Sequence, residues 1–223
     1  MRSIITMGLL CTLLLQLPAC AQQPRELPDV SLPKPQGETV ELFNGEDFSG
    51  WKLFLPDEGA DPAETWQVKD SIVMCSGEPA GYMRTTDTYS DYVLTFEWRW
   101  PKGGGNSGVL LHIQEEDEVW PKSIEGQLQH QSAADFWVIG GTDFNEREGV
   151  IGRRLPKAKP STEKPLGEWN QYTVEAKGDT IILSINGEVQ NIATGATVRE
   201  GYIGLQSEGT PIEFRNITLQ RYE

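Results

Sequence analysis

Hydrophobic and polar positions alternate in short runs along most of this chain. In residues 92–100 every even position is apolar, whereas the odd positions carry Val, Thr, Glu and Arg. This period of two predicts a strand with one buried face. From Val40 onward similar runs of β-branched and aromatic residues are separated by Gly, Asn, Asp and Pro, and no segment keeps a helical period.

The C-terminal part carries the clearest turn signals. Residues 180–186 followed by Gly187 predict a hairpin, because Asn-Gly suits the type I′ turn. Segments 171–177, 202–207 and 212–219 complete a predicted C-terminal meander. Turn signals recur every ten or so residues, so we expect an all-β sandwich or jelly roll of antiparallel sheets. The polar, lysine- and arginine-rich stretch from residue 140 to 166 is predicted to be a long loop.

The N-terminus predicts export. Arg2 and the apolar run of residues 4–17 are typical of a signal peptide at residues 1–19, and the run is too short for a comfortable membrane span. Leu17-Pro18-Ala19-Cys20 resembles a lipobox, in which Cys20 is lipidated. Ordinary secretion with cleavage near Ala21 stays an alternative. Residues 20–39 then form a Pro-rich tether, and residues 40–223 form one domain. Ala21 after the cysteine favours an outer-membrane lipoprotein, which we expect to face the periplasm.

Charge and cysteine usage narrow the function. Removing the signal takes one Arg and no acid, which leaves 18 basic against 33 acidic side chains. This balance argues against nucleic-acid binding and is compatible with a neutral substrate. Cys75 is the one cysteine of the predicted domain, and its apolar neighbours favour a buried structural thiol over a nucleophile.

A set of polar residues on predicted strands is the remaining candidate for chemistry. Glu97 and Arg99 share one strand face, His112 lies on the next strand, and Glu125 and Gln127 alternate along a third. If these strands are neighbours, their polar faces form one wall; the alternative is a face that simply meets water. The acidic run at 115–118 does not fit the Glu-x-Asp-x-x-Glu pattern of retaining glucanases, so a two-carboxylate hydrolase of that type is not supported.

Eight short motifs span the predicted domain: LFNG (42–45) with GW (50–51), GYMRT (81–85), FEWR (96–99), GNSGV (105–109), SIEGQL (123–128), DFW (135–137), GEWN (167–170) and GLQSEG (204–209). In this order they resemble the 3-keto-disaccharide hydrolase family. The resemblance implies a concanavalin-like jelly roll with a substrate groove on one sheet. It also implies activity on glycosides that a separate sugar 3-dehydrogenase has oxidised at C3.

That activity has a simple chemical logic. A C3 ketone acidifies the C2 proton, so a general base can remove it and the C1 aglycone can leave; water then adds to the resulting 2-hydroxy-glucal. We expect Glu125 or His112 to be the base or acid and Arg99 to stabilise the enolate oxygen. The expected substrate-binding residues are Glu97, which would orient Arg99, together with Asn106, Gln127, His130, Arg84 and Arg154.

Three further questions stay open in the sequence. No cofactor is assigned, although a divalent metal held by some of these side chains is an alternative. A non-catalytic lectin module on the same fold competes with the enzyme hypothesis, and an envelope scaffold is a third interpretation. Only the enzyme hypothesis gives a reason to bury Glu125, His112 and Arg99 together, because isolated buried charges are costly.

Overall fold

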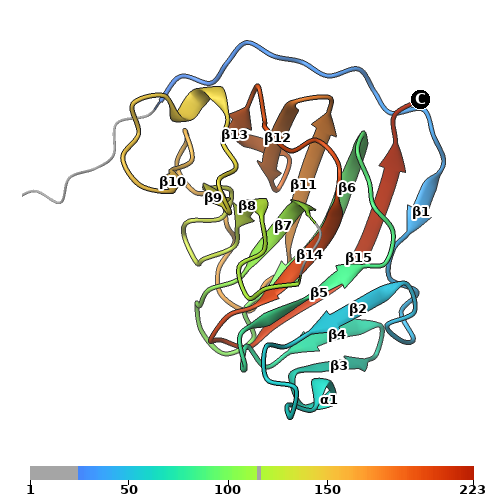
Figure 1. Cartoon of the computed structure of the whole chain (residues 1–223). Helices are drawn as coiled ribbons and strands as arrows, with labels where there is room; N and C mark the ends of the chain where they lie inside the picture. The colour runs from blue at the N-terminus through green and yellow to red at the C-terminus, as the bar shows by residue number, and fades with distance from the viewer. Residues whose placement is uncertain (1–24, 115–116) are drawn as a thin grey trace, which may run out of the picture.

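A computed structural model describes residues 25–114 and 117–223 of the chain and shows two β-sheets packed face to face (Figure 1). Both sheets are antiparallel throughout, so the predicted all-β sandwich is confirmed. The predicted signal peptide and the lipidation site Cys20 lie outside the described residues. Among the described residues, helical structure is limited to one turn of α-helix, α1 (Pro62–Thr65), and one of 3-10 helix, η1 (Asn145–Arg147).

The strands fall into an eight-stranded sheet A and a seven-stranded sheet B. In spatial order sheet A contains β13 (Glu188–Ala193), β12 (Thr180–Ile185), β11 (Asn170–Lys177), β6 (Tyr92–Arg99), β15 (Ile212–Arg221), β4 (Ile72–Cys75) and β3 (Trp66–Lys69), with β1 (Thr39–Glu41) also paired to β15. Sheet B contains β10 (Arg154–Leu155), β9 (Phe136–Ile139), β8 (Ser123–Gln127), β7 (Gly108–Ile113), β14 (Tyr202–Ser207), β5 (Gly81–Thr85) and β2 (Trp51–Phe54).

The core lies between the two sheets, and period-two alternation supplies it. Strand β6 sends Leu94, Phe96 and Trp98 inward, where Phe96 stacks on Tyr172 at a ring distance of 5.2 Å. Sheet B contributes Val109, Leu111 and Ile124 to the same cluster. Burial of such aromatic and aliphatic surface provides most of the stability of a sandwich of this size. Four of the seven tryptophans are buried in this cluster: Trp51, Trp66, Trp98 and Trp100.

Consecutive strands often change sheet, which corrects two expectations. Strand β6 belongs to sheet A, whereas β7 and β8 are paired neighbours in sheet B, so the predicted polar wall of three strands is wrong for β6. The predicted C-terminal meander is correct for β11, β12 and β13 only, because β14 crosses to sheet B before β15 returns to sheet A. The Asn186-Gly187 hairpin is confirmed, since both residues have the positive φ that a type I′ turn requires.

A β-bulge in β7 changes the direction of His112. Two residues, Leu111 and His112, lie where β14 has only Ile203, and His112 has a φ of 56°. The bulge turns the imidazole into the core, where it packs edge-on against Tyr92 and its Nδ1 lies 3.1 Å from the carbonyl of Val198. His112 is therefore a buried core residue, and the prediction that it serves as base or acid is wrong.

Burial gives His112 a consequence for acid stability. Desolvation lowers the pKa of His112 to about 4, against the raising effect of the Val198 hydrogen bond, whereas an unfolded His titrates near 6.5. The unfolded chain thus binds more protons between these values, and the free energy of unfolding falls as the pH drops through this window, by about 3 kcal/mol in total. We expect His112→Asn, which tolerates the positive φ, to flatten this part of the stability curve. Urea denaturation from pH 7 to pH 4 measures it, and parallel curves for the two proteins would contradict the assignment.

Cys75 ends strand β4 in the interior of the sandwich. Its side chain is 3% exposed, and burial raises the pKa of the thiol to about 11, although Ser207 and Gly77 donate hydrogen bonds that lower it. A thiol that stays protonated at neutral pH is a poor nucleophile. The prediction of a buried structural cysteine is confirmed.

The described part of the predicted tether lies along the sandwich rather than free of it (Figure 1). Arg25 hydrogen-bonds to the side chain of Asn191 on β13, and the amide of Gly37 donates to the carbonyl of Arg221 on β15 at 3.1 Å. Residues 25–38 between these contacts form no helix or strand. Within the described residues no helix is both long enough and apolar enough to cross a membrane.

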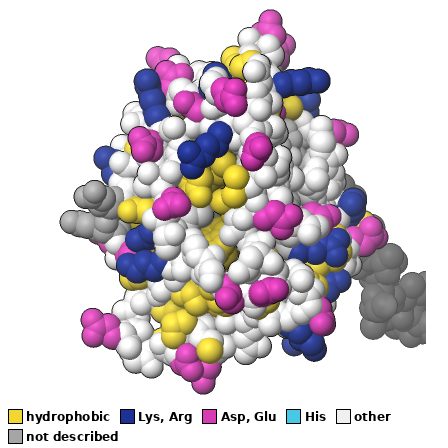
Figure 2. Space-filling model, turned by 90° about the vertical axis from the view of Figure 1, so that its right-hand side faces the viewer, with side chains coloured by type: hydrophobic (Ala, Val, Ile, Leu, Met, Phe, Trp, Pro, Cys, Tyr) yellow, Lys and Arg dark blue, Asp and Glu magenta, His cyan; other side chains and the backbone are white. Residues whose placement is uncertain are grey.

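The surface charges are mixed rather than gathered by sign where they can be seen in Figure 2. On the face that looks to the right in Figure 1, acidic and basic side chains alternate with exposed apolar ones. The described residues on that face form no continuous basic surface of the kind that nucleic acid requires.

Candidate functional site

The outer face of sheet B, which points away from the core, carries the candidate site. The register places Gly108 of β7 between Gln127 on β8 and Gln206 on β14, and Asn106 opposite Glu208. Together with Glu125 on β8, these side chains share one face because residues two apart on a strand point the same way. A pocket of about 140 Å³ opens here; its lining residues are Asn106, Trp120, Glu125, Gln127, Trp137, Ile139, Arg153 and Glu208.

Glu125 is the central titratable group of this pocket. It is 5% exposed, and its Oε1 has no hydrogen-bond partner among the described residues. Burial raises the pKa of Glu125 to about 8, helped by the negative charge of Glu208 and opposed by the positive charge of Arg153. A carboxyl group with this pKa can give or take a proton near neutral pH, which is the property of a general acid or base.

The absence of a side chain at Gly108 leaves space for the carboxyl group of Glu125. A Cβ atom on Gly108 would lie 2.4 Å from Oε1 of Glu125 and 2.3 Å from Oε1 of Gln206. The two side chains therefore converge over the bare backbone of β7. Without a side chain at position 108, Glu125 lines the pocket and Gln206 lies beside it.

Several buried polar atoms around this pocket lack partners in the described part of the chain. They are both amide atoms of Gln206, Oδ1 of Asn106 and the indole Nε1 of Trp137, in addition to Oε1 of Glu125. A buried polar atom without a partner costs roughly 1–3 kcal/mol, so several in one place indicate a site built for a polar ligand. Gln127 differs, because its Oε1 already accepts from the amides of Leu128 and Gln129 at 2.8 Å.

Two charged residues complete the pocket. Glu208 is half-buried, and burial raises its pKa while a side-chain hydrogen bond from Asn106 lowers it. Arg153 lies over the Trp137 ring, with the guanidinium carbon 5.5 Å from the ring centroid. Trp120 on the loop after β7 is exposed beside them. The pocket thus combines two carboxyl groups, one cation, amides and two indoles.

Arg84 lies on the same sheet face, but it is engaged elsewhere. Its Nε donates to Asp117 at 2.7 Å, and Tyr82 and Lys52 also contact this carboxylate. Burial acts to raise the pKa of Asp117, but the hydrogen bonds from these three side chains bring it well below its ordinary value. Arg84 therefore attaches to the sheet the loop that contains Trp120. The Arg84 side chain itself does not line the pocket.

Arg99 and Glu97 are far from this pocket, on the outer face of sheet A. Arg99 pairs with Glu213 at 2.5 Å and Glu97 with Arg215 at 2.8 Å, and both pairs are direct cross-strand neighbours. Arg99 and Arg215 also lie over the ring of Trp169, at 4.6 and 4.0 Å. Such opposite-charge pairs stabilise a sheet. The predicted roles of Arg99 at an enolate and of Glu97 in orienting it are wrong for the Glu125 pocket, because β6 belongs to the other sheet.

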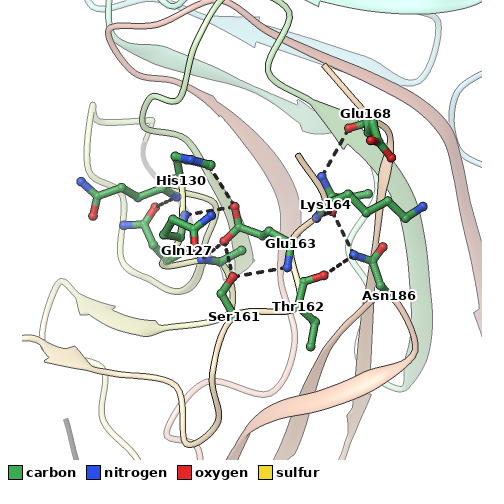
Figure 3. A network of polar contacts seen from close by, with 12 residues as sticks. Gln127, His130, Ser161, Thr162, Glu163, Lys164, Glu168 and Asn186 are labelled. Atoms are coloured by element: carbon green, nitrogen blue, oxygen red, sulfur yellow. Dashed lines mark hydrogen bonds and ion pairs between the residues drawn. The ribbon is translucent and has the colours of Figure 1, made fainter. Parts of the chain in front are cut away.

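His130 and Arg154 belong to loop contacts at the edge of the pocket. His130 Nδ1 lies 3.3 Å from Glu163, whose carboxylate also accepts from the backbone amides of Gln131 and Ala133 (Figure 3). Arg154 pairs with the buried Asp135 through Nε at 2.6 Å. Neither side chain lines the pocket, so their prediction as substrate-binding residues is corrected; the neighbouring Arg153 lines it instead.

A second pocket lies on the outer edge of sheet A, but it lacks this chemistry. Its lining is mostly apolar or paired, with Met74, Pro101 and Pro211 beside the Glu213 carboxylate that Arg99 holds. Across residues 25–114 and 117–223, no three or more His, Cys, Asp or Glu side chains are grouped to hold a metal ion.

Sequence reasoning placed Glu125, Gln127 and Asn106 in the pocket and missed the residues around them. Trp137 belongs to the motif DFW (135–137), and Gln206 and Glu208 belong to GLQSEG (204–209), where alternation along β14 puts these two residues on one face. The missing information was that β14 lies beside β7. This pairing joins segments about 100 residues apart and has no local signal.

Comparison with known proteins agrees with this fold and shows the family. Residues 38–220 match the family model described as the 3-keto-alpha-glucoside-1,2-lyase-like domain. A protein of Bacteroides thetaiotaomicron named 3-keto-disaccharide hydrolase is 23% identical over 248 residues, covering 87% of this chain and 82% of that protein.

Solved structures support the fold. A proposed glycosyl hydrolase from Parabacteroides distasonis superposes with a TM-score of 0.63 at 24% identity, covering 84% of this chain and 94% of that chain. The carbohydrate-binding module CBM66 from Bacillus subtilis superposes with a TM-score of 0.58 at 14% identity, covering 77% and 95%. At these identities the likeness concerns the fold alone, and it agrees with the expected jelly roll.

Proposed function

The chain belongs to the family of 3-keto-alpha-glucoside-1,2-lyase-like domains, and from this premise we propose that it cleaves 3-keto-glycosides in the pocket around Glu125. The observation that carries the proposal is Glu125 itself. It is a nearly buried carboxyl group with a pKa near 8 and an unpartnered oxygen, held at the floor of a pocket lined by indoles and amides.

The reaction needs proton transfer and enolate stabilisation. Removal of the C2 proton leaves the electron pair delocalised over C2, C3 and the C3 oxygen. The C1–O bond then breaks as C1=C2 forms and the C3 carbonyl returns, and the aglycone oxygen takes a proton. Addition of water, with OH to C1 and H to C2, completes a net hydrolysis. Glu125 suits one of the proton transfers, and Arg153 supplies a positive charge for the enolate oxygen.

The remaining pocket residues suit a sugar. Trp137 and Trp120 provide flat aromatic surfaces for the C–H face of a pyranose, and Asn106 and Gln127 provide amides for its hydroxyl groups. Gln206 adds two unpartnered amide atoms beside Glu125. These residues replace Arg99, Glu97 and His112 of the sequence-based assignment.

A non-catalytic carbohydrate-binding module is the second candidate function. The superposition on CBM66 favours it, because a fold of this type can bind sugars without cleaving them. A binding module has little use for a carboxyl group that is buried without a partner, since burial of this kind costs stability. This cost favours the enzyme.

Incubation of the purified chain with a 3-keto disaccharide and with its unoxidised parent tests the proposal. We expect aglycone release from the 3-keto sugar only, with a 2-hydroxy-glucal detectable by mass spectrometry or NMR. Binding of either sugar without release or glucal formation would favour the binding module. If the chain neither binds nor cleaves either sugar, both candidate functions are contradicted.

Replacement of Arg153 is expected to shift the pH dependence of the rate. Since Arg153 lowers the pKa of Glu125, Arg153→Gln raises that pKa, and the inflection that we expect near pH 8 moves to higher pH. Arg154→Gln is the matched control, because the adjacent Arg154 pairs with Asp135 outside the pocket. Rate–pH profiles of the three proteins measure the shift. A shift of equal size in the control, or none in Arg153→Gln, would contradict the role of Arg153.

We also propose the cellular setting predicted from the sequence. Lipidation of Cys20 would anchor the protein in the outer membrane facing the periplasm, and a separate sugar 3-dehydrogenase would supply its oxidised substrates. Metabolic labelling with a fatty-acid analogue, compared between the wild-type chain and Cys20→Ala, tests the anchor. Label that persists in the variant would reject Cys20 as the lipidation site.

A further inference from the structure

The proposed elimination moves two protons, and the pocket contains two carboxyl groups. One group must take the proton from C2, and another must give a proton to the aglycone oxygen as it leaves C1. Among the described residues that line the pocket, Glu125 and Glu208 are the two acids. Their positions and surroundings differ enough to assign each a separate task.

The two carboxyl groups reach the pocket from opposite sides of strand β7. Glu125 comes from β8 and Glu208 from the end of β14, and these strands flank β7 on either side. Between them β7 presents Gly108 and Asn106, so that a sugar ring standing with one edge on this floor has one carboxyl group at each of its faces. In the chair of an α-glucoside the C2–H and C1–O bonds are both axial and point to opposite faces. A base and an acid on opposite sides suit this geometry.

Their surroundings decide which group holds the proton. Glu125 is 5% exposed and its Oε1 lacks a partner, whereas Glu208 is only half-buried and Asn106 donates a hydrogen bond to it. The two acids repel each other when both are ionised, so a single proton shared between them goes to the more buried one. Of the two groups, Glu125 is therefore the one that holds the proton and serves as the acid, which leaves Glu208 to serve as the base.

We propose that Glu208 removes the C2 proton and that Glu125 protonates the oxygen that leaves C1. The electron pair of the C2–H bond first forms the enolate, then forms C1=C2 as the C1–O bond breaks, and the leaving oxygen takes the proton of Glu125. Hydration reverses the tasks: ionised Glu125 accepts a proton from the water that attacks C1, and protonated Glu208 returns its proton to C2. Both groups end in their starting states. This assignment rests on the proposed function and adds the separate task of each acid.

Exchange of the C2 hydrogen in deuterium oxide separates the two tasks, because it requires the base but no departure of the aglycone. We expect Glu125→Gln to catalyse deuterium incorporation into unreacted 3-keto disaccharide while aglycone release falls at least about 100-fold. We expect Glu208→Gln to lose both exchange and release. Proton NMR of the recovered substrate measures exchange, and incubation without enzyme gives the background rate.

The aglycone provides an independent readout of the acid. A p-nitrophenolate leaves without protonation, whereas a sugar alkoxide does not. We therefore expect Glu125→Gln to lose much less activity on a p-nitrophenyl 3-keto-α-glucoside than on the 3-keto disaccharide. Glu208→Gln should be equally impaired on both. Glu213→Gln is the matched control, since it neutralises a buried glutamate on sheet A and leaves the pocket intact.

The outcomes are distinguishable. Exchange at the wild-type rate in Glu208→Gln, or its loss in Glu125→Gln, would overturn the assignment while the wild-type activity stands. Equal losses of Glu125→Gln on both aglycones would also overturn it. If the wild-type protein neither exchanges the C2 hydrogen nor releases either aglycone, the proposed function itself fails. Thermal unfolding of each variant shows whether a loss of activity comes from a loss of fold.

Discussion

Gly108→Ala is expected to lower aglycone release from a 3-keto glycoside by about 100-fold, while the protein stays folded. The added Cβ would lie 2.4 Å from Oε1 of Glu125 and 2.3 Å from Oε1 of Gln206, closer than any two such atoms can approach. Both contacts involve the ends of flexible side chains, so they are relieved by rotating these side chains rather than by moving the sheet. The fold therefore loses little, whereas the acid at the floor of the pocket loses its position.

Gly59→Ala is the matched control for this substitution. Gly59 lies in an exposed turn, where the nearest atom to a new Cβ is the Asp57 carboxylate at 3.3 Å. Steady-state rates and thermal unfolding of both variants test the prediction. Wild-type rates in Gly108→Ala would show that the positions of Glu125 and Gln206 do not matter for the reaction. A loss of folded protein would instead place Gly108 among residues that the sheet itself requires.

Glu125→Gln is expected to stabilise the protein at alkaline pH. The pKa of Glu125 is about 8 in the folded protein and near 4.5 when unfolded, so the folded state binds more protons between these values. The wild-type free energy of unfolding should therefore fall as the pH rises through this window, by on the order of 4 kcal/mol once pH 8 is passed. Glutamine has no charge to bury. We therefore expect the free energy of unfolding of the variant not to fall with pH in this window.

Urea denaturation from pH 5 to pH 9 measures the difference between the two curves. Glu213→Gln should show no such gain, because it removes a carboxylate that Arg99 already pairs at 2.5 Å. Curves for wild-type and Glu125→Gln that run parallel would mean that Glu125 is ionised at little cost, which would remove the main support for its catalytic role. A stabilised but inactive variant is the signature of a residue kept for function.

The side chains that share each face of a strand could be predicted from the sequence. Alternation in β6 assigned Phe96 and Trp98 to one side and Glu97 and Arg99 to the other, and the structure shows this division. The same rule placed Glu125 and Gln127 together on β8. Period-two patterns report which side chains share a face because that property depends on a single strand.

Neighbouring strands could not be predicted in the same way. Arg99 and Glu125 lie on different sheets because the chain crosses between layers after β6, and a crossover leaves no periodic trace in the sequence. The place of Glu208 in the pocket could not be predicted either, because β14 pairs with β7 although the two strands are far apart in the sequence. Local patterns identify the surfaces, whereas the topology decides which surfaces meet.

His112 illustrates a third limit. Regular alternation would have placed its imidazole on the side of Leu110, but the extra residue of the bulge reverses the direction. This bulge places His112 at a positive φ and packs it against Tyr92 and the carbonyl of Val198. These partners are distant in sequence, so the side-chain direction could be read only from the folded chain.

The N-terminal segment that lies along the sandwich sets how far the domain could travel from an anchor. A free spacer of the length of residues 20–39 would let the domain wander by tens of ångströms. With Arg25 held by Asn191, only five peptide steps separate Cys20 from the folded surface, a reach of at most about 18 Å. An enzyme lipidated at Cys20 would thus stand on a short stem with one end of its sandwich toward the bilayer. Because the domain would move little relative to the membrane, its substrates would have to diffuse to it.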